Sequence, residues 1–263
     1  MPRAHQPRKR FGQHFLHDPS VIRRLLAAID PRPGQRLVEI GPGPGALTVP
    51  LLQRLGNLDV IELDRDLVTA LAERCLDLGE LRIHPVDALR FDFRTLAGPG
   101  ERLRIVGNLP YNISTPLLFR FLDAAAHIRD MTLMLQREVV ERMAASPGTR
   151  TYGRLTVMLA ARCRVEKLFL VRAGAFSPPP KVESAVVRVV PYAKPPFDPG
   201  DWSLFERIVR AGFTARRKTL RNALRGLADA STIEAAGLDP RARPDTLSPA
   251  DYAQLSSHLA RSP

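Results

Sequence analysis

Short apolar runs alternate with longer amphipathic segments through the first half of the sequence, and this alternation constrains the fold more than any other feature. Five runs have the length and composition of buried strands: residues 37–40, 58–61, 81–84, 103–106 and 131–135. Parallel strands are joined by crossover connections of a dozen or more residues, usually helices. The rhythm therefore predicts an α/β fold with a doubly wound, mostly parallel sheet.

Two further patterns define the edges of this sheet domain. Near the N-terminus, Asp18 followed by Pro19 has the pattern of a helix N-cap with proline in the first turn, and apolar residues at helical spacing follow. Later, residues 165–171 and 182–190 are β-rich, and the proline-rich loop between them is too short for a crossover helix. We expect an amphipathic helix after Asp18 and an antiparallel hairpin at the end of the sheet.

The C-terminal part has a different character. Four prolines between residues 191 and 201 indicate a linker. Helical spacing then recurs three times, over residues 202–213, 216–227 and 250–260. The predicted organisation is an α/β domain with a basic N-terminal arm over residues 1–192, a linker over 193–201 and a small all-α domain over 202–263.

The charge of the chain predicts its kind of partner. A net charge of +12 and a pI near 10.7 favour a polyanion, with nucleic acid ahead of membrane lipid. A coding bias accounts for 34 Arg against 5 Lys, but it does not account for the excess of bases over acids. Cys75, Cys163 and the histidines show no metal-ligand spacing, so no metal is expected. No apolar run suits a signal peptide or a membrane span, which favours a cytoplasmic protein.

A glycine-rich loop follows the first predicted strand and precedes a helical segment. Such a strand-to-helix turn binds nucleotide-like ligands. A dinucleotide-binding enzyme is the main alternative, but its pyrophosphate is held by backbone N–H groups, and Pro42 and Pro44 have none. Gly41, Gly43 and Gly45 have the spacing G-x-G-x-G, which suits close approach to an uncharged ribose and amino-acid moiety. We therefore favour S-adenosylmethionine over NAD.

Acidic residues follow the next two predicted strands. Glu62 lies about twenty residues from the loop, where a carboxylate can accept from both ribose hydroxyls. Asp64 nearby could be mistaken for it. Asp87, followed by Ala88, could accept from the adenine amine of the cofactor, although a plain loop aspartate is the alternative.

The sequence Asn108-Leu109-Pro110-Tyr111 follows the fourth predicted strand. An adenine N6 amine is a poor nucleophile, so an enzyme must orient it with acceptors aimed at its N–H groups. The Asn108 side chain and the Leu109 backbone carbonyl can be those acceptors, while Pro110 stiffens the turn. Tyr111 can stack on an extruded base. An ordinary turn is the alternative, since Asn and Pro both form turns.

Segments spread over almost the whole chain resemble the KsgA (RsmA) family of small-subunit ribosomal RNA adenine dimethyltransferases. They are residues 8–16, 39–45, 61–64, 108–114, 136–139, 176–184 and 216–220. The resemblance implies a Rossmann-like class I S-adenosylmethionine-dependent methyltransferase sheet. It also implies cofactor contacts from His14, Leu16, Gly41, Glu62, Asp87 and Asn108.

The same resemblance implies a substrate. It is two adjacent adenosines in the 3′-terminal hairpin of 16S rRNA, dimethylated within an assembling small subunit, with S-adenosyl-L-homocysteine as the product. Phe176 is implied to join Tyr111 around the target adenine. His14 departs from the family, which usually has Asn there, so its cofactor contact is expected to use the imidazole or the backbone. No pattern indicates an oligomer, and a monomer is expected.

Basic clusters are candidates for RNA contacts. Arg217, Arg221 and Arg225 recur every four residues, which predicts one stripe along a helix. Arg216 and Lys218 enlarge this cluster, and the N-terminal arm adds Arg8, Lys9 and Arg10. A merely solvated helix face is the alternative.

Two other functions compete with this assignment. One is methylation of DNA adenines or protein glutamine amides, which need similar carbonyl acceptors. Leu109 in place of a proline and the helical tail argue against it. The other is a ribosome-assembly factor that mainly binds immature subunits, with methylation secondary or absent.

Overall fold

The computed structural model describes residues 13–261 of the chain. They divide into two compact units, of which the first comprises residues 13–140 and 166–191 and the second residues 141–165 and 192–261. Residues 141–165, expected in the α/β domain, thus group with the C-terminal helices. Within the described residues, no helix is long and apolar enough to cross a membrane.

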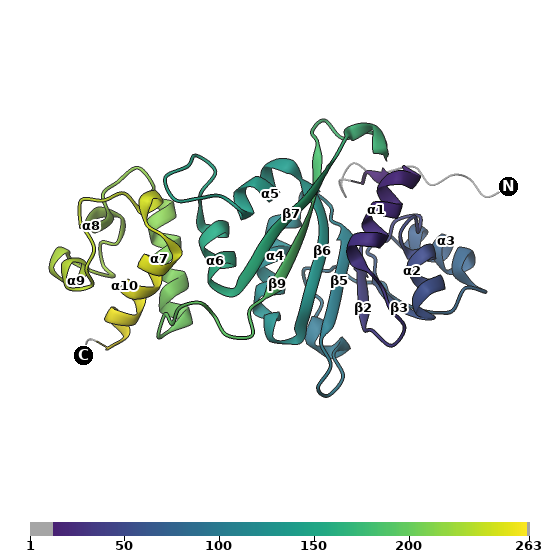
Figure 1. Cartoon of the computed structure of the whole chain (residues 1–263), viewed down its shortest axis with the longest axis horizontal. Helices are drawn as coiled ribbons and strands as arrows, with labels where there is room; N and C mark the ends of the chain where they lie inside the picture. Colours follow the sequence, from purple (N-terminus) through teal and green to yellow (C-terminus); the bar gives the residue numbers. More distant parts are fainter. Residues whose placement is uncertain (1–12, 262–263) are drawn as a thin grey trace. The chain divides into compact units, whose positions relative to one another are not determined.

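The first unit is built on a seven-stranded sheet in the order β4-β3-β2-β5-β6-β9-β7 (Figure 1). The first five of these strands run parallel, whereas β9 pairs antiparallel with β6. The predicted mostly parallel sheet with antiparallel strands at its end is confirmed. The strands are β2 (Leu37–Ile40), β3 (Asn57–Ile61), β4 (Glu80–His84), β5 (Leu103–Asn108), β6 (Ile128–Gln136), β7 (Cys163–Val171) and β9 (Ser184–Pro191).

A two-stranded antiparallel sheet lies outside this main sheet and joins the N-terminal segment to a later loop. It pairs β1 (Phe15–Leu16) with β8 (Phe176–Ser177). Helices and short 3₁₀ turns complete the unit: α1 (Pro19–Ile29), α2 (Thr48–Leu55), α3 (Arg65–Cys75), η2 (Phe93–Leu96), α4 (Ser114–Asp123), η3 (Ala125–His127), η4 (Ala173–Ala175) and the start of α5 (Arg137–Met143).

Helix α1 begins as its sequence predicts. The Asp18 carboxylate accepts from the backbone N–H groups of Ser20 and Val21, which would otherwise lack partners. Four apolar residues at helical spacing are buried on its inner face: Val21, Leu25, Leu26 and Ile29. They join one hydrophobic core with residues of α2, α3 and the central strands. Cys75 belongs to this core, and like Cys163 it is a buried free thiol.

The second unit is helical. Two buried tyrosines anchor its core, because the Tyr152 hydroxyl donates to the Leu247 carbonyl and the Tyr252 hydroxyl donates to the Pro244 carbonyl, both at 2.7 Å. Its elements are α6 (Arg154–Arg162), α7 (Trp202–Thr214), α8 (Leu220–Ala223), α9 (Ala230–Ala235), η5 (Pro244–Thr246) and α10 (Pro249–Arg261).

The helix predicted over residues 216–227 is wrong in extent, since only Leu220–Ala223 is helical. Thr219 has extended backbone, and the N–H groups of Leu220 and Arg221 donate to the carbonyls of Ala242 and Pro240. Tertiary partners thus occupy the backbone groups that a longer helix would use. Arg217 and Arg225 lie in turns on either side of α8, and the predicted single stripe does not form.

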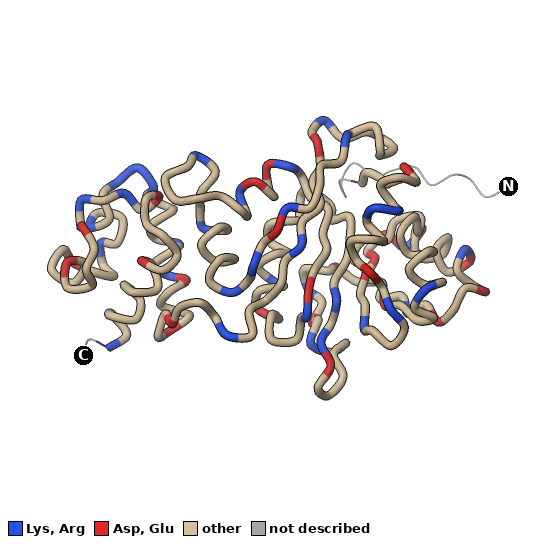
Figure 2. Tube along the Cα trace, in the orientation of Figure 1, with Lys and Arg blue, Asp and Glu red and all other residues tan. Residues whose placement is uncertain are grey.

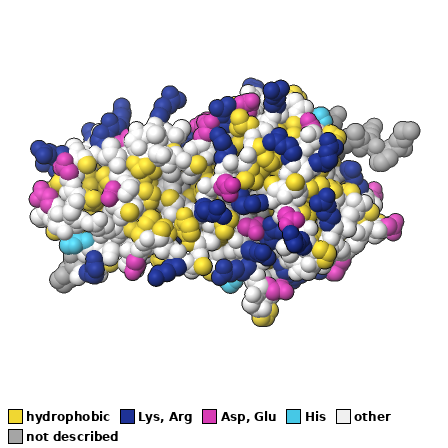
Figure 3. All heavy atoms as spheres, in the orientation of Figure 1, with side chains coloured by type: hydrophobic (Ala, Val, Ile, Leu, Met, Phe, Trp, Pro, Cys, Tyr) yellow, Lys and Arg dark blue, Asp and Glu magenta, His cyan; other side chains and the backbone are white. Residues whose placement is uncertain are grey.

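Positive charge is concentrated in the helical unit. Residues 141–165 and 192–263 contain 16 Lys and Arg against 9 Asp and Glu, which accounts for +7 of the net +12. Figure 2 shows a run of basic residues in the segment that leads into α8, and Figure 3 shows Lys and Arg side chains projecting from the surface. The helical unit therefore carries more than half of the net positive charge.

Candidate functional site

A cleft of about 200 Å³ lies at the carboxyl ends of the parallel strands, within the first unit. The chain runs from β2 to β3 and β4 on one side, and β5 and β6 lie on the other side. The cleft therefore occupies the point where the strand order reverses, at which doubly wound sheets bind ligands. Its lining comes from five segments and one residue of α3: 13–15, 40–43 without Pro42, 61–63, 86–88, 108–113 and Leu67.

The glycine loop forms the floor of this cleft at the end of β2. Gly43 and Gly45 have φ values of +56° and +88°, in the left-handed region that favours glycine. A Cβ on Gly43 would lie 3.1 Å from Phe15 Cδ1, and one on Gly45 would lie 2.7 Å from Leu71 Cδ1. Both the backbone conformation and the packing therefore require glycine here.

Glu62 lines the cleft just past β3. Its carboxylate accepts from the backbone N–H of Asp64 at 2.9 Å and of Gly43 at 3.4 Å, and it is 8% exposed. Burial raises the pKa of this carboxyl, and the backbone N–H groups lower it in part. Asp64 is instead the N-cap of α3 and does not line the cleft. Of these two nearby acids, only Glu62 lines the cleft.

Asp87 and Ala88, which follow β4 next to β3, also line the cleft. Leu63 and Val86 also line it, and they are 47% and 38% exposed. Neither apolar residue was expected at the site from its sequence, although each adjoins an acid that was. Exposed apolar side chains beside a carboxylate fit a flat heterocycle that carries an amine.

Asn108 lies at the end of β5, where the cleft opens. Its amide nitrogen donates to the backbone carbonyl of His14 at 2.9 Å, so its carbonyl oxygen is the atom left for an incoming donor. The backbone N–H of Leu109 donates to the Met134 carbonyl at 3.1 Å, which fixes the strand end. Asn108, Leu109, Pro110 and Tyr111 all line the cleft.

Tyr111 is held from two sides. Its hydroxyl lies 2.5 Å from the buried Ser184 hydroxyl on β9, and its ring centroid lies 5.5 Å from that of His14. Burial raises the pKa of the phenol, and the bond to Ser184 lowers it in part. The ring is therefore a neutral, oriented surface at the mouth of the cleft.

Two residues implied by the family resemblance lie elsewhere. Leu16 lines a smaller adjoining cavity, and Phe176 is 2% exposed in the hydrophobic core. These two residues face each other in the β1–β8 register, so the short sheet holds Phe176 away from the cleft. His14 does line the cleft, and its ring Nδ1 lies 2.7 Å from the Pro178 carbonyl.

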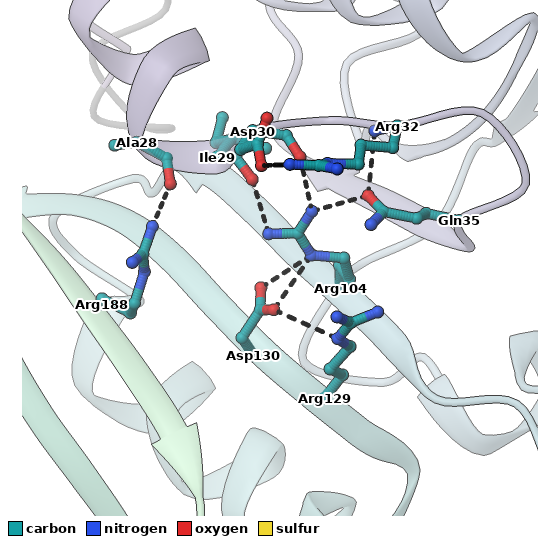
Figure 4. Close-up of polar contacts among 9 residues, drawn as sticks. All are labelled: Ala28, Ile29, Asp30, Arg32, Gln35, Arg104, Arg129, Asp130 and Arg188. Atoms are coloured by element: carbon teal, nitrogen blue, oxygen red, sulfur yellow. Dashed lines mark hydrogen bonds and ion pairs between the residues drawn. The ribbon is translucent and has the colours of Figure 1, made fainter.

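Two arginines anchor the helix that follows the cleft-lining residues 13–15 (Figure 4). Arg104 on β5 donates to the carbonyls of Ile29 and Asp30 at 2.6 Å and 3.2 Å, and Arg188 on β9 donates to the Ala28 carbonyl. The last carbonyls of a helix lack intrahelical partners and carry partial negative charge. The guanidinium groups therefore tie the C-terminal end of α1 to the sheet.

The predicted RNA-binding residues differ in their surroundings. Arg216 is tied into the fold, because its guanidinium pairs with Asp245 at 3.2 Å and donates to the carbonyls of Thr149 and Arg150. By contrast, four exposed basic residues form no ion pair among the described residues: Arg217, Lys218, Arg221 and Arg225. Arg8, Lys9 and Arg10 lie outside the described residues.

Residues 4–261 match the family model described as ribosomal RNA adenine dimethylase. Ribosomal RNA small subunit methyltransferase A of Nitrosococcus oceani is 57% identical over 97% of each chain, and that of Pseudomonas putida is 55% identical over 97% of this chain and 96% of the relative.

Two solved structures have similar folds. A dimethyladenosine transferase from Plasmodium falciparum aligns with a TM-score of 0.78 at 25% identity, over 92% of this chain and 96% of that chain. The 23S rRNA methyltransferase ErmE aligns with a TM-score of 0.70 at 27% identity, over 93% and 99%. The likeness extends through both units.

Proposed function

Because the chain belongs to the ribosomal RNA adenine dimethylase family, we propose that it dimethylates N6 of two adjacent adenosines in the 3′-terminal hairpin of 16S rRNA, using S-adenosylmethionine. The observation that carries this proposal is the position of Asn108 and Leu109, which line the same cleft as the glycine loop and Glu62. A methyl donor and an amine acceptor would meet there.

The residues of the cleft fit the cofactor. The left-handed glycines allow the backbone to approach it closely, and buried Glu62 offers an acceptor to the ribose hydroxyls. Leu63 and Val86, which line the cleft, would offer apolar contact to the adenine ring, and Asp87 would accept from its amine. His14 and Leu16 would contact the amino-acid end. When bound, S-adenosylmethionine supplies an electrophilic methyl group and leaves as S-adenosyl-L-homocysteine.

The protein contributes mainly orientation to the reaction. Asn108 and the Leu109 carbonyl would each accept from one N–H of the target amine and turn its lone pair toward the methyl group. Positioning of this kind lowers barriers by up to about 7–11 kcal/mol in favourable cases. Tyr111, held by Ser184, would stack on the extruded base for about 1–3 kcal/mol. No strong general base is required.

Phe176 has a more limited role in the proposed reaction. Its side chain lies in the core, and a contact with the target base needs a shift of β8. We therefore assign it to base binding only in an RNA-bound state.

RNA binding would use the basic residues of the helical unit. Arg217, Lys218, Arg221 and Arg225 are exposed and unpaired, as phosphate contacts require. We propose a monomer that acts in the cytoplasm on 16S rRNA within the immature 30S subunit and also assists its assembly. The basic N-terminal arm, with Arg8, Lys9 and Arg10, would add contacts to the RNA.

The test uses the full chain with labelled S-adenosylmethionine and four acceptors: unmethylated 30S subunits, naked 16S rRNA, DNA and protein. Digestion to nucleosides should show N6,N6-dimethyladenosine from the subunits. The Asn108→Ala variant serves as the matched control. Label only on DNA or protein would overturn the proposal. No label on any of the four acceptors would leave a binding protein without methyltransferase activity.

A further inference from the structure

Glu39 is a buried acid for which the proposed reaction has no role. It is the next-to-last residue of β2, it is 2% exposed, and it immediately precedes the glycine loop. The strand register pairs Glu39 with Val106 on β5, and Val106 with Thr132 on β6. The three side chains therefore point to the same face of the sheet. Neither Glu39 Oε2 nor Thr132 Oγ1 has a hydrogen-bond partner among the described residues.

A small cavity connects this acid to the cleft. It has a volume of about 30 Å³, enough for one water-sized polar group, and both Glu39 and Thr132 line it. Gly41, Gly43 and Asn108 line this cavity and the cleft alike. Glu39 thus lines a cavity that shares residues of the glycine loop with the cleft.

Apart from the Thr48 hydroxyl, the groups around Glu39 do not stabilise a carboxylate. Of the charged or titratable groups nearby, Glu62 beyond β3 is acidic, and Cys75 on α3 is a buried thiol. Arg74 on α3 donates to the Pro44 carbonyl, and Arg188 on β9 donates to the end of α1. The cavity residues from β1 and α1 are apolar. Burial raises the pKa of Glu39 to about 8, against a smaller lowering by the Thr48 hydroxyl.

The order of acceptors across the sheet places the amino-acid end of the cofactor beside this acid. Asp87 follows β4, Glu62 follows β3, and Asn108 ends β5. With adenine at the first, ribose at the second and the methyl group at the third, the rest of the cofactor must lie near the glycine loop and Leu16. These are the residues that line the small cavity.

We propose that Glu39 is a protonated, neutral acid in the free protein and releases its proton when the ammonium group of the cofactor docks beside the glycine loop. This inference rests on the proposed use of S-adenosylmethionine. A cation within about 4–6 Å lowers the pKa of a carboxyl by about 1–3 units. The proton passes to the buffer, and the ammonium keeps its own. Ligands with the amino-acid end should bind more tightly as pH rises toward 8, by up to about tenfold per pH unit.

The test counts protons by calorimetry of the full chain at pH 7, in phosphate and in Tris, which differ in ionisation enthalpy. Binding of S-adenosylhomocysteine should release about 0.4–0.9 proton, the range expected at pH 7 when a pKa of about 8 falls by about 1–3 units. The ligand 5′-methylthioadenosine, which lacks the amino-acid end, should release almost none. Glu39→Gln should bind S-adenosylhomocysteine with almost no release. Glu73→Gln, which changes an exposed acid on α3, should behave as the unaltered protein does.

Each other outcome is decisive. If S-adenosylhomocysteine binds without proton release, or if Glu39→Gln releases as much as the unaltered protein, the inference is overturned while the proposed function stands. If S-adenosylhomocysteine gives no binding heat in either buffer and S-adenosylmethionine gives none either, both fail together. The contrast between the two ligands uses the unaltered chain, so it holds even if Glu39→Gln does not fold.

Discussion

The Arg104→Met substitution removes the main tie between α1 and the sheet. The Arg104 side chain is 8% exposed, and its guanidinium bonds both oxygens of Asp130 at 3.0 Å as well as Gln35 and two carbonyls at the end of α1 (Figure 4). Methionine fills a similar volume but offers no donor. The change leaves a largely buried carboxylate and two helix-end carbonyls without these partners.

Breaking a buried pair in this way costs about 3–5 kcal/mol. Arg129, 4.0 Å from Asp130, can recover part of the lost pairing, so we expect the lower end of this range. Removing the acid as well, in Arg104→Met/Asp130→Leu, should restore part of the loss, because apolar replacements of a buried pair are often close to neutral. Arg94→Met breaks an exposed pair with Asp92 and should cost much less, because solvent screens exposed pairs.

Native-state hydrogen exchange of the β2 and β5 amides measures the opening free energy of the sheet unit itself. Circular dichroism during urea denaturation gives the corresponding change for the whole chain. Binding of S-adenosylhomocysteine should weaken as well, because residues 13–15 line the cleft just ahead of α1. A loss for Arg104→Met no larger than that for Arg94→Met would refute the proposed role of these bonds, and so would a double variant less stable than the single one.

Three further predictions concern the site and the surface. Asn108→Ala should lower kcat by about 10²–10³-fold, because loss of one oriented polar group costs about 3–4 kcal/mol in a transition state. Cofactor binding should still be measurable by calorimetry. Near-normal turnover would remove Asn108 from the mechanism. The double substitution Arg217→Ala/Arg221→Ala should weaken RNA binding and reduce the slope of log K against log salt by about 1.4, the value for two phosphate contacts to single-stranded RNA. Arg54→Ala on α2 is the control and should leave the slope unchanged. An unchanged slope for the double variant would contradict phosphate contact. Folded Glu39 holds a proton up to a pKa of about 8, whereas the unfolded chain loses it near 4.5, so stability should fall as pH rises between these values, by up to about 1.4 kcal/mol per pH unit. The free energy of unfolding of Glu39→Gln, measured by urea denaturation, should lack this pH-dependent component. Identical pH profiles for the variant and the unaltered protein would show that Glu39 is ionised in the free protein.

Local sequence patterns were sufficient to predict much of the sheet unit. The five predicted parallel strands all occur, and each observed strand contains its predicted run, because buried strands need continuous apolar residues. Asp18 caps α1 through its own neighbouring N–H groups, which is a contact within three residues. The glycine loop, Glu62, Asp87 and the segment from Asn108 to Tyr111 all line one cleft, since carboxyl ends of parallel strands meet at one edge.

Contacts between distant segments decided the rest. Residues 216–227 have helical spacing, but backbone groups of Ala242 and Pro240 take the hydrogen bonds that a longer helix needs. Likewise, Arg216 is part of a predicted basic cluster, yet Asp245 holds it in the fold. Phe176 is buried because β8 pairs with β1, about 160 residues earlier, a register that neither segment encodes alone.

By itself, the sequence determined where the strands lie along the chain, where the helices begin and the chemistry of the residues that line the cleft. These depend on neighbours a few positions apart. Only the tertiary structure decided which arginines form no ion pair among the described residues, which of two nearby acids lines the cleft and which groups surround Glu39. The reason is physical: burial and pairing are set by whichever segments pack around a side chain, and those segments come from strands and helices far apart in the sequence.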